Sequence, residues 1–156
     1  MKISTCITVK NEEGWIGTLL DSLLAQSRKA DEIIIVDGGS TDKTVEIIKH
    51  YQKKNKRSLP SFDGKNIKLL VERGRIAHGR NTAIEIAKYP IIAQIDAGCI
   101  AKTDWLEKLV RPFELSHPPG VHSAAWRESG GGVGVSAGFY IMPSCSPLQK
   151  AMCLYL

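Results

Sequence analysis

Acidic residues follow two apolar segments of this 156-residue chain, at the points where strands of a sheet would end. The segment EIIIVD ends in Asp37, and the segment IIAQID ends in Asp96. Gly38 and Gly39 follow the first acid, and glycine lets a ligand approach the backbone closely. A carboxylate in such a position accepts hydrogen bonds from a nucleoside, or holds a divalent cation together with substrate phosphates. These two acids are therefore the first candidates for a binding site.

Each acid also has an interpretation that involves no ligand. Asp37, in DGGSTD, has the sequence context of an Asx-turn or a helix cap. Asp96, in IDAGC, is compatible with a capped turn between a strand and a helix. Receiver domains also end a strand in aspartate, but Glu12 and Glu13 followed by DGGSTD match their acidic cluster poorly.

A third group of polar residues lies in the segment ERGRIAHGRN. It carries Arg73, Arg75 and Arg80, and guanidinium groups near two strand-end acids either pair with them or bind a diphosphate. At least one of the three arginines is expected to be an ordinary surface residue. His78 in the same segment is interpreted as an exposed loop histidine, with a role as general base as the alternative.

The elements that position these residues alternate between apolar strand patterns and helical patterns. Near-continuous apolar strands separated by helices predict an α/β protein, a single domain whose mostly parallel sheet is covered by helices on both faces. Thr103 is expected to cap the last helix, and Pro112 to end it. Strands are predicted at residues 3–9, 32–37, 67–72 and 91–96, and helices at 15–26, after Ser40 or Thr41, at 79–88 and at 103–114.

In a sheet of this kind, ligands bind beyond the carboxyl ends of the strands. Three of the four predicted strands deliver polar residues to that edge, in the ranges 8–12, 37–41 and 96–98. We expect Thr8, Asp37 and Asp96 to meet in one pocket at that edge.

Composition narrows the class of protein. Hydrophobic residues make up 43% of the chain and charged residues 24%, as in soluble globular proteins. The sequence has no 18-residue apolar stretch and a poor signal peptide, so a cytoplasmic location is expected. The four cysteines form no Cys-x-x-Cys pair, which favours buried thiols over disulfides or a zinc site.

The formal net charge of +5 includes a basic run, KHYQKKNKR, at residues 49–57. A lysine-rich helix end is the ordinary interpretation, because cations complement the helix dipole. A membrane-surface patch, which would place the protein at the cytosolic membrane face, is an alternative. No aromatic residue besides Tyr51 interleaves with these cations, so no nucleic-acid partner is predicted.

The last forty residues have a different composition. Residues 116–156 are predicted to form a Gly- and Pro-rich loop, a strand near 133–140 and the start of an apolar helix at Pro147. The glycines at 130–138 do not form a GxGxxG motif that opens a helix, which excludes a dinucleotide fingerprint. The helix has no polar closing turn before Leu156, so this segment is interpreted as interrupted.

Taken together in their order, four segments resemble the family-2 glycosyltransferases, which have the Rossmann-like GT-A fold. The resemblance implies that residues 1–115 are the donor-binding core and residues 116–156 the beginning of an incomplete acceptor-side segment. The four segments are TVKNEEGWIGTLLDSLLAQS, DEIIIVDGGSTDKTVEII, GRIAHGRNTAIEIAK and IIAQIDAGCIAKTDWLEKLVRPF.

The resemblance also assigns roles by position. Asp37 matches the acid that contacts the nucleotide base, and Asp96 matches the first acid of the DxD signature, which faces the ribose and the metal-bound diphosphate. Arg80 and Asn81 match a motif that packs beneath the site. The donor nucleotide-binding set implied by the resemblance is Thr8, Asn11, Glu12, Asp37, Gly39, Ser40, Arg75 and Asp96, and the implied metal ligand is Asp96.

The implied activity is the transfer, with inversion, of a sugar from a nucleotide-diphosphate-sugar donor to an acceptor hydroxyl, assisted by Mg²⁺ or Mn²⁺. The sequence departs from the family at Gly98, which replaces the second acid of DxD. None of the later acids Glu107, Glu114 and Glu128 lies in a motif like that of the family's catalytic base. The alternatives are a nucleotide-sugar-binding module without a general base, and a scaffold protein that uses the basic run.

Overall fold

The computed structural model describes residues 1–58, 66–115 and 140–141. The predicted loop and helix of residues 116–156, and all but the end of the strand near 133–140, lie outside the described residues. The elements in chain order are β1 (Ile3–Val9), α1 (Ile16–Leu24), β2 (Glu32–Asp37), α2 (Thr44–Ser58), β3 (Ile67–Val71), α3 (Ile76–Glu85), β4 (Ile91–Asp96), β5 (Ile100–Ala101), α4 (Trp105–Leu115) and β6 (Tyr140–Ile141).

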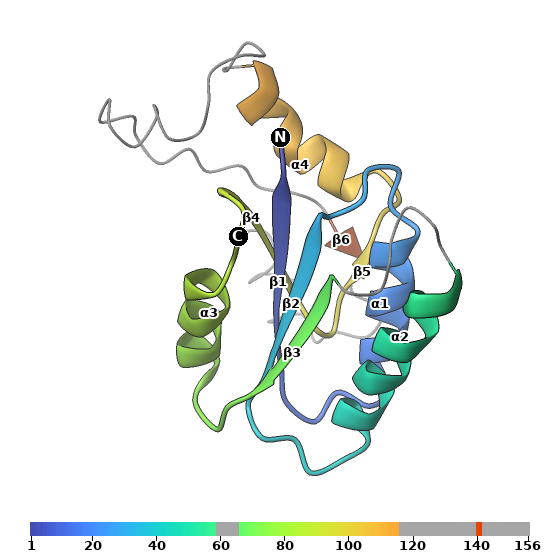
Figure 1. Ribbon diagram of the computed structural model, residues 1–156, viewed down its shortest axis with the longest axis vertical. Coiled ribbons are helices and arrows are strands. Elements are labelled where there is room, and N and C mark those ends of the chain that lie inside the picture. The colour runs from blue at the N-terminus through green and yellow to red at the C-terminus, as the bar shows by residue number, and fades with distance from the viewer. Residues whose placement is uncertain (59–65, 116–139, 142–156) are drawn as a thin grey trace.

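Four parallel strands form the central sheet, in the order β3-β2-β1-β4. β5 and β6 pair separately as a short antiparallel ribbon. The loops that follow β1, β2 and β3 gather at the lower end of the molecule in Figure 1, whereas α4 and the N-terminus lie at the upper end. The predicted α/β class, with a mostly parallel sheet, is confirmed.

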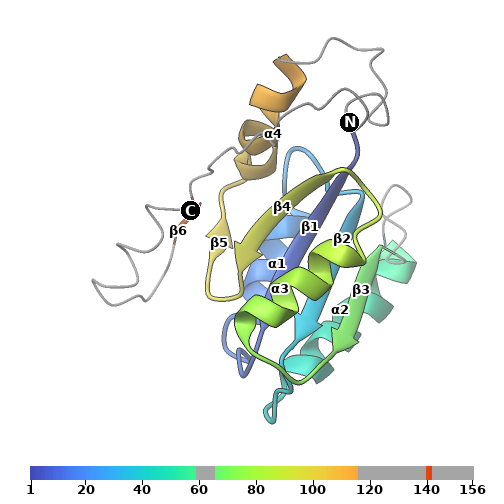
Figure 2. The same cartoon turned by 90° about the vertical axis from the view of Figure 1, so that its left-hand side faces the viewer.

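Helices cover both faces of the sheet, which explains why its central strands lack alternation. α1 and α2 lie on one face and α3 on the other (Figures 1 and 2). Every residue of β1 and β2 is buried. The larger core joins these strands to the apolar face of α1, with Ile16, Leu19, Leu20 and Leu23, and to Trp105 and Leu106 of α4.

The predicted helix at 79–88 begins earlier than expected, at Ile76, and ends at Glu85. The prediction took Gly79 as the helix start, but Gly79 lies inside α3, where the helix approaches β1 and β2. A Cβ on Gly79 would lie 3.2 Å from Thr8 Cγ2 and 3.5 Å from Val36 Cγ1. A glycine at this position therefore allows the helix to pack closely against the sheet and does not mark the start of the helix.

The basic run of residues 49–57 lies within α2, on its carboxyl-terminal part. This is the lysine-rich helix end that the sequence suggested, and Lys49, His50 and Lys53 are exposed. The start of α2 differs from the prediction, because the helix begins at Thr44 rather than directly after Ser40 or Thr41.

The last predicted helix also differs at both ends. α4 extends through position 112 to Leu115 instead of ending near Pro112. Its first turn is capped from another element, because the buried Gln26 side chain accepts a hydrogen bond from Leu106 N at 2.9 Å. Gln26 Nε2 also donates to Lys102 O at 2.6 Å, which ties the end of α1 to the start of α4.

A buried carboxylate joins several elements at the end of the sheet opposite the strand-end loops. Glu32 accepts hydrogen bonds from Ser4 Oγ and Lys88 N, each at 2.6 Å, and pairs with Lys68 Nζ at 2.7 Å. Burial alone would raise the pKa of Glu32, but these hydrogen bonds lower it below its ordinary value of 4.5. The ionised form therefore stabilises the fold.

We predict that Glu32→Gln lowers the free energy of unfolding at pH 7 by about 1.5–3 kcal/mol, the range for hydrogen bonds to charged groups. Because the pKa of Glu32 is depressed in the folded state, this stabilisation is present above the ordinary value and is lost as the pH falls through the folded-state pKa. Urea denaturation at pH 7 and at acidic pH should therefore show the difference between wild type and variant shrinking on acidification.

The matched control is Asp104→Asn, which removes the acid directly before α4 that pairs with the exposed Lys108 of that helix. This exposed pair is expected to leave the unfolding free energy nearly unchanged. A difference between wild type and Glu32→Gln that is constant across this pH range would contradict the role assigned to the Glu32 charge.

Candidate functional site

The order of the strands creates a point where the chain changes direction across the sheet. From β1 the chain proceeds to β2 and β3 on one side, and then returns to place β4 on the other side of β1. In open α/β sheets, ligands bind in the crevice beyond the carboxyl ends of the strands at such a point. Thr8 of β1 and Asp96 of β4 are register partners at this position.

The loop after β1 and the loop after β2 are joined by hydrogen bonds in both directions. Asn11 Oδ1 accepts from Thr41 N at 2.8 Å, and Asn11 N donates to Ser40 Oγ at 2.8 Å. Asn11 adopts a positive φ of 54°, a conformation that asparagine tolerates better than most residues. We call this contact between residues 10–15 and residues 38–44 the loop junction.

Three further hydrogen bonds complete the loop junction. Glu12 N donates to Thr44 Oγ1 at 2.8 Å, and Glu13 N donates to Asp42 Oδ2 at 3.1 Å. In return, Lys43 N donates to Glu13 Oε2 at 2.9 Å. Asp42 Oδ1 also accepts from Thr44 N, so Asp42, not Ser40 or Thr41, caps the start of α2.

Asp37 uses its carboxylate within its own turn. Oδ2 accepts from Gly39 N at 3.0 Å and from Ser40 N at 2.9 Å, and Oδ1 accepts from Ser40 Oγ. The residue is fully buried. The Asx-turn interpretation of this acid is therefore what the structure shows, and its contact with a nucleotide base stays a prediction.

The structure brings Thr8 and Asp96 together and separates Asp37 from them. Register partners in neighbouring strands share a face of the sheet, so Thr8, Val36 and Asp96 face α3, whereas Asp37 and Val9 face the opposite side. β1 also lies between the strands of the two acids, a spacing of roughly 10 Å. Thr8 and Asp96 thus share the α3 side of the sheet and Asp37 does not, so the three side chains do not meet at one point as expected.

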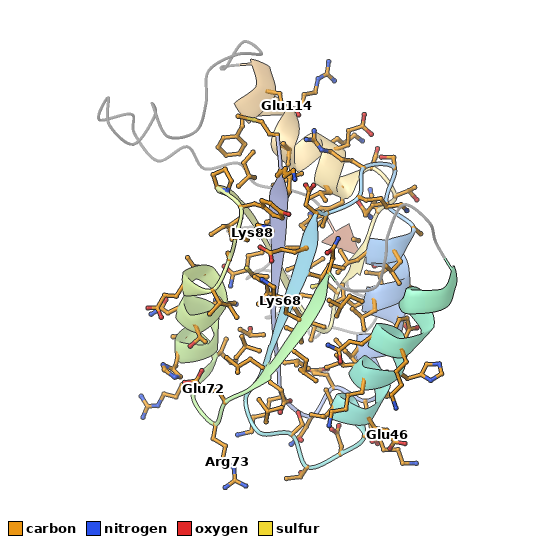
Figure 3. The ribbon with its side chains drawn as sticks, viewed as in Figure 1. Glu46, Lys68, Glu72, Arg73, Lys88 and Glu114 are labelled. Carbon is orange, nitrogen blue, oxygen red and sulfur yellow. The ribbon has the colours of Figure 1, made fainter. Side chains whose placement is uncertain are left out.

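Arg73 lies where the sequence suggested free space beside the glycines. Gly39 has a φ of 87°, and a Cβ at this position would come within 2.8 Å of Arg73 Cγ. Figure 3 shows the Arg73 side chain at the lower end of the molecule, beyond the end of β3. Gly39 is therefore required both for its backbone conformation and for the passage of Arg73.

Arg80 forms the ion pair that the arginine-rich segment suggested. Its Nη2 donates to Asp96 Oδ1 at 2.8 Å, and both side chains are partly exposed, at 32% for Arg80 and 39% for Asp96. Arg75 occupies the N-cap position of α3 and is exposed at the same edge. His78 is exposed as expected, but it lies in the first turn of α3 rather than in a loop, and its Nε2 pairs with Glu72, which follows β3, at 2.8 Å.

The acidic residues of this edge offer few ligands for a metal ion. No group of three His, Cys, Asp or Glu side chains within the described residues could hold a metal ion. Asp96 Oδ1 is occupied by Arg80, and Gly98 supplies no carboxylate. Burial and the Asp42 charge raise the pKa of Glu12. A divalent cation at Asp96 Oδ2 would need its remaining ligands from substrate phosphates and water, and the metal role of Asp96 stays a prediction.

Two of the later acids, Glu107 and Glu114, form contacts at the end of the molecule that carries α4. Glu107 Oε2 accepts from Ser27 Oγ at 2.7 Å, and Glu114 pairs with Arg28. Glu107 and Glu114 also line a shallow charged groove along α4, which lies at the end opposite the strand-end loops. Glu128 lies outside the described residues.

The buried cysteines and the apolar content of the helices were also predicted from the sequence. Cys6 and Cys99 are buried thiols, as predicted, and burial followed by the Glu32 charge raises the pKa of Cys6 to about 12. Within the described residues, no helix is long and apolar enough to span a bilayer.

Sequence reasoning did not anticipate the loop junction. Its contacts join residues about thirty positions apart, and the polar residues NEE and STDKT carry no pattern that pairs one with the other. Capping residues at the start of both helices were the available signal, but they predict local contacts only.

We predict that Asn11→Ala destabilises the protein by about 1–2 kcal/mol, because it removes the acceptor for Thr41 N and places alanine at a positive φ. The matched control Asn11→Gly removes the same acceptor but tolerates the backbone conformation. Asn11→Gly should therefore be the milder variant in thermal or urea denaturation. Equal stability of wild type, Asn11→Ala and Asn11→Gly would contradict the importance of the junction.

Comparison with known proteins identifies relatives over most of the described residues. The chain is 38% identical over 99 residues to a poly(ribitol-phosphate) beta-glucosyltransferase of Bacillus spizizenii, which is 62% of this chain and 15% of that protein. Across the first curated relatives it matches, the chain spans between 15% and 43% of their lengths. It is thus similar to one part of longer proteins.

Solved structures share the fold. TarS 1–349 of S. aureus has a TM-score of 0.60 and 26% identity, over 75% of this chain and 33% of that one. The mannosyltransferase PcManGT from Pyrobaculum calidifontis, solved with GDP-Man and Mn²⁺, has a TM-score of 0.62 and 25% identity, over 77% of this chain and 33% of that one. The fold is therefore that of the GT-A glycosyltransferases.

A family model described as glycosyl transferase family 2 matches residues 4–134. That range includes all four parallel strands but for the first residue of β1, together with the loop junction, Asp37, Arg80 and Asp96. The chain therefore belongs to glycosyl transferase family 2.

Proposed function

We propose that this chain is the donor-binding part of an inverting glycosyltransferase, which transfers a sugar from a nucleotide-diphosphate sugar to an acceptor hydroxyl. The observation that carries the proposal is the polar edge at the switch point between β1 and β4, where Thr8 and Asp96 are register partners and Arg80 pairs with the acid. The family assignment supports sugar transfer as the reaction.

The donor would lie across this edge, with its diphosphate near the cationic side chains. Lys10, Arg73 and Arg75 are exposed there, and guanidinium groups bind phosphate oxygens with paired hydrogen bonds. The loop junction would act by preorganisation, because the backbone that contacts the nucleotide is already held in place. The donor set of Thr8, Asn11, Glu12, Asp37, Gly39, Ser40, Arg75 and Asp96 remains the proposed one.

Within this set, the contacts in the structure suggest two kinds of role. Arg75 is exposed and Asp96 is partly exposed, so a ligand can touch their side chains, whereas Thr8 is buried against Gly79 and would support the site from within the sheet. Asn11, Asp37 and Ser40 would position the loops, since their polar atoms are occupied by one another and by neighbouring amides.

A divalent cation, Mg²⁺ or Mn²⁺, would be held by Asp96 Oδ2 together with the diphosphate. When bound, such an ion offsets the charge that develops on the departing diphosphate. A structural relative of this chain was solved with GDP-Man and Mn²⁺, which supports the choice of cation.

The reaction also needs an acceptor hydroxyl and a general base. An inverting transfer needs a carboxylate that removes the proton of the acceptor hydroxyl. Glu107 and Glu114 of α4 contact Ser27 and Arg28, at the end of the molecule away from the proposed donor site. This observation favours a second candidate function, a module that binds the nucleotide sugar without turning it over.

We predict that the chain binds a nucleoside diphosphate, UDP or GDP, in calorimetry, and that Arg75→Ala weakens this binding about 10- to 150-fold, the equivalent of one charge-assisted hydrogen bond. The matched control is Arg111→Ala, an exposed arginine of α4 at the opposite end of the molecule, which should leave the affinity unchanged. Absence of binding to both nucleotides would contradict the proposed function.

Turnover separates the two candidates. Incubation with a panel of nucleotide sugars, with and without Mn²⁺, should release nucleoside diphosphate if the chain carries out hydrolysis or transfer. Tight binding without product would instead support the binding module. Turnover that neither depends on Mn²⁺ nor changes in Asp96→Ala would rule out the proposed metal role.

The location of the protein in the cell is also a prediction. The chain is proposed to act in the cytoplasm, with association at the cytosolic membrane face through exposed cations such as Lys49 and Lys53 of α2. If the protein is instead a scaffold that uses the basic run, charge reversal at these lysines should abolish partner or membrane association and leave the nucleotide affinity unchanged.

A further inference from the structure

The ion pair between Arg80 and Asp96 stands at the centre of the proposed donor site. Arg80 belongs to the second turn of α3, and Gly79 before it lets the helix approach β1 and β2 closely enough for the guanidinium to reach the end of β4. The 2.8 Å hydrogen bond engages Oδ1 of Asp96, and Oδ2 accepts no hydrogen bond from the described residues. The acid thus presents one oxygen to a ligand.

A role confined to packing does not account for an arginine at this position. Its Nε is buried and has no hydrogen-bond partner in the part of the chain that the structure describes. A buried donor without a partner is unfavourable, and an apolar side chain would avoid that cost. The charge of Arg80 is therefore the property that requires an explanation.

The local charge balance gives this explanation. Asp96 supplies one negative charge, Arg80 cancels it, and Gly98 adds none. A Cβ at Gly98 would have no neighbour within 4 Å among the described residues, so steric crowding does not prevent an acid there. Without a ligand, the pair is neutral and offers a divalent cation little net attraction.

A divalent cation on Asp96 Oδ2 would share one carboxylate with the Arg80 guanidinium, and two positive charges on the same carboxylate repel each other strongly. A nucleoside diphosphate reverses this balance, because its negative charge attracts both cations at once. The same Arg80 that disfavours the metal ion alone would therefore favour the diphosphate.

On the basis of the proposed function, we propose that Arg80 is a positioning residue that makes metal binding conditional on the donor: it holds Asp96 by Oδ1, repels a divalent cation from the empty site, and attracts the diphosphate that brings the cation with it. Donor and cation then bind together rather than the cation first.

The test measures two affinities separately in the full chain. Free Mn²⁺ is titrated without nucleotide and followed by electron paramagnetic resonance, and UDP or GDP is titrated in the presence of a chelator by calorimetry. Arg80→Gln should tighten Mn²⁺ binding about tenfold, because a unit charge near a divalent ion is removed. The same variant should weaken nucleoside diphosphate binding by a similar factor.

Arg80→Lys retains the charge and should keep both affinities within a few-fold of wild type. The matched control Arg28→Gln removes an arginine that pairs with Glu114 at the other end of the molecule, and should change neither affinity. If Arg80→Gln weakens both ligands together, or changes neither, the proposal is overturned, because a merely structural role predicts those results.

Asp96→Asn provides a second test that leaves Arg80 in place. It should abolish Mn²⁺ binding and, in chelator, weaken nucleoside diphosphate binding less than Arg80→Gln does, since the arginine that attracts the diphosphate remains. A loss of that affinity as large as the loss in Arg80→Gln would overturn the proposal. If wild type binds neither UDP nor GDP, the proposed function fails, whereas the Mn²⁺ titrations of wild type and Arg80→Gln still judge the role of Arg80.

Discussion

The loop junction is the interaction on which the site depends. Two loops that follow neighbouring parallel strands would otherwise expose several backbone amides at the edge of the sheet. Asn11 and Glu13 of the first loop accept hydrogen bonds from amides of the second, and the side chains of Ser40, Asp42 and Thr44 accept from amides of the first in return. Because the contacts are reciprocal, neither loop can move without breaking bonds of the other, and the edge is preformed.

The contacts of the loop junction and of its turn suggest a structural role for several residues that the sequence indicated as ligand contacts. Polar residues at the carboxyl ends of strands are candidates for binding, but polar backbone groups in a loop need partners as well. In this structure Asn11, Asp37 and Ser40 supply those partners. The side chains that remain available at the edge are mainly cationic, among them Arg73 and Arg75, with the Arg80–Asp96 pair behind them.

The sequence predicted the sheet well because its signal is physical and local. Continuous apolar segments such as EIIIVD can be satisfied only by a strand with both faces covered, and β2 has the predicted bounds. Helix ends were predicted less well. Gly79 lies inside α3 for reasons of packing, and the first turn of α4 is capped by Gln26, which is distant in sequence.

The site was predicted in part for the same reason. The carboxyl edge and the approach of arginines to strand-end acids follow from strand order and composition, and Arg80 does pair with Asp96. The separation of Asp37 from Asp96 follows from register, which places Asp37 opposite Val9 and Asp96 opposite Thr8. Register depends on contacts across the sheet and cannot be inferred from one strand alone.

A chain of 17.1 kDa is well suited to mapping of amide chemical shifts by nuclear magnetic resonance during titration with UDP or GDP. If the carboxyl edge is the donor site, the largest shifts will occur at residues 8–13, 38–41, 73–75 and 96–98. Shifts concentrated on the charged face of α4, or scattered over the molecule with none at these four segments, would contradict the account.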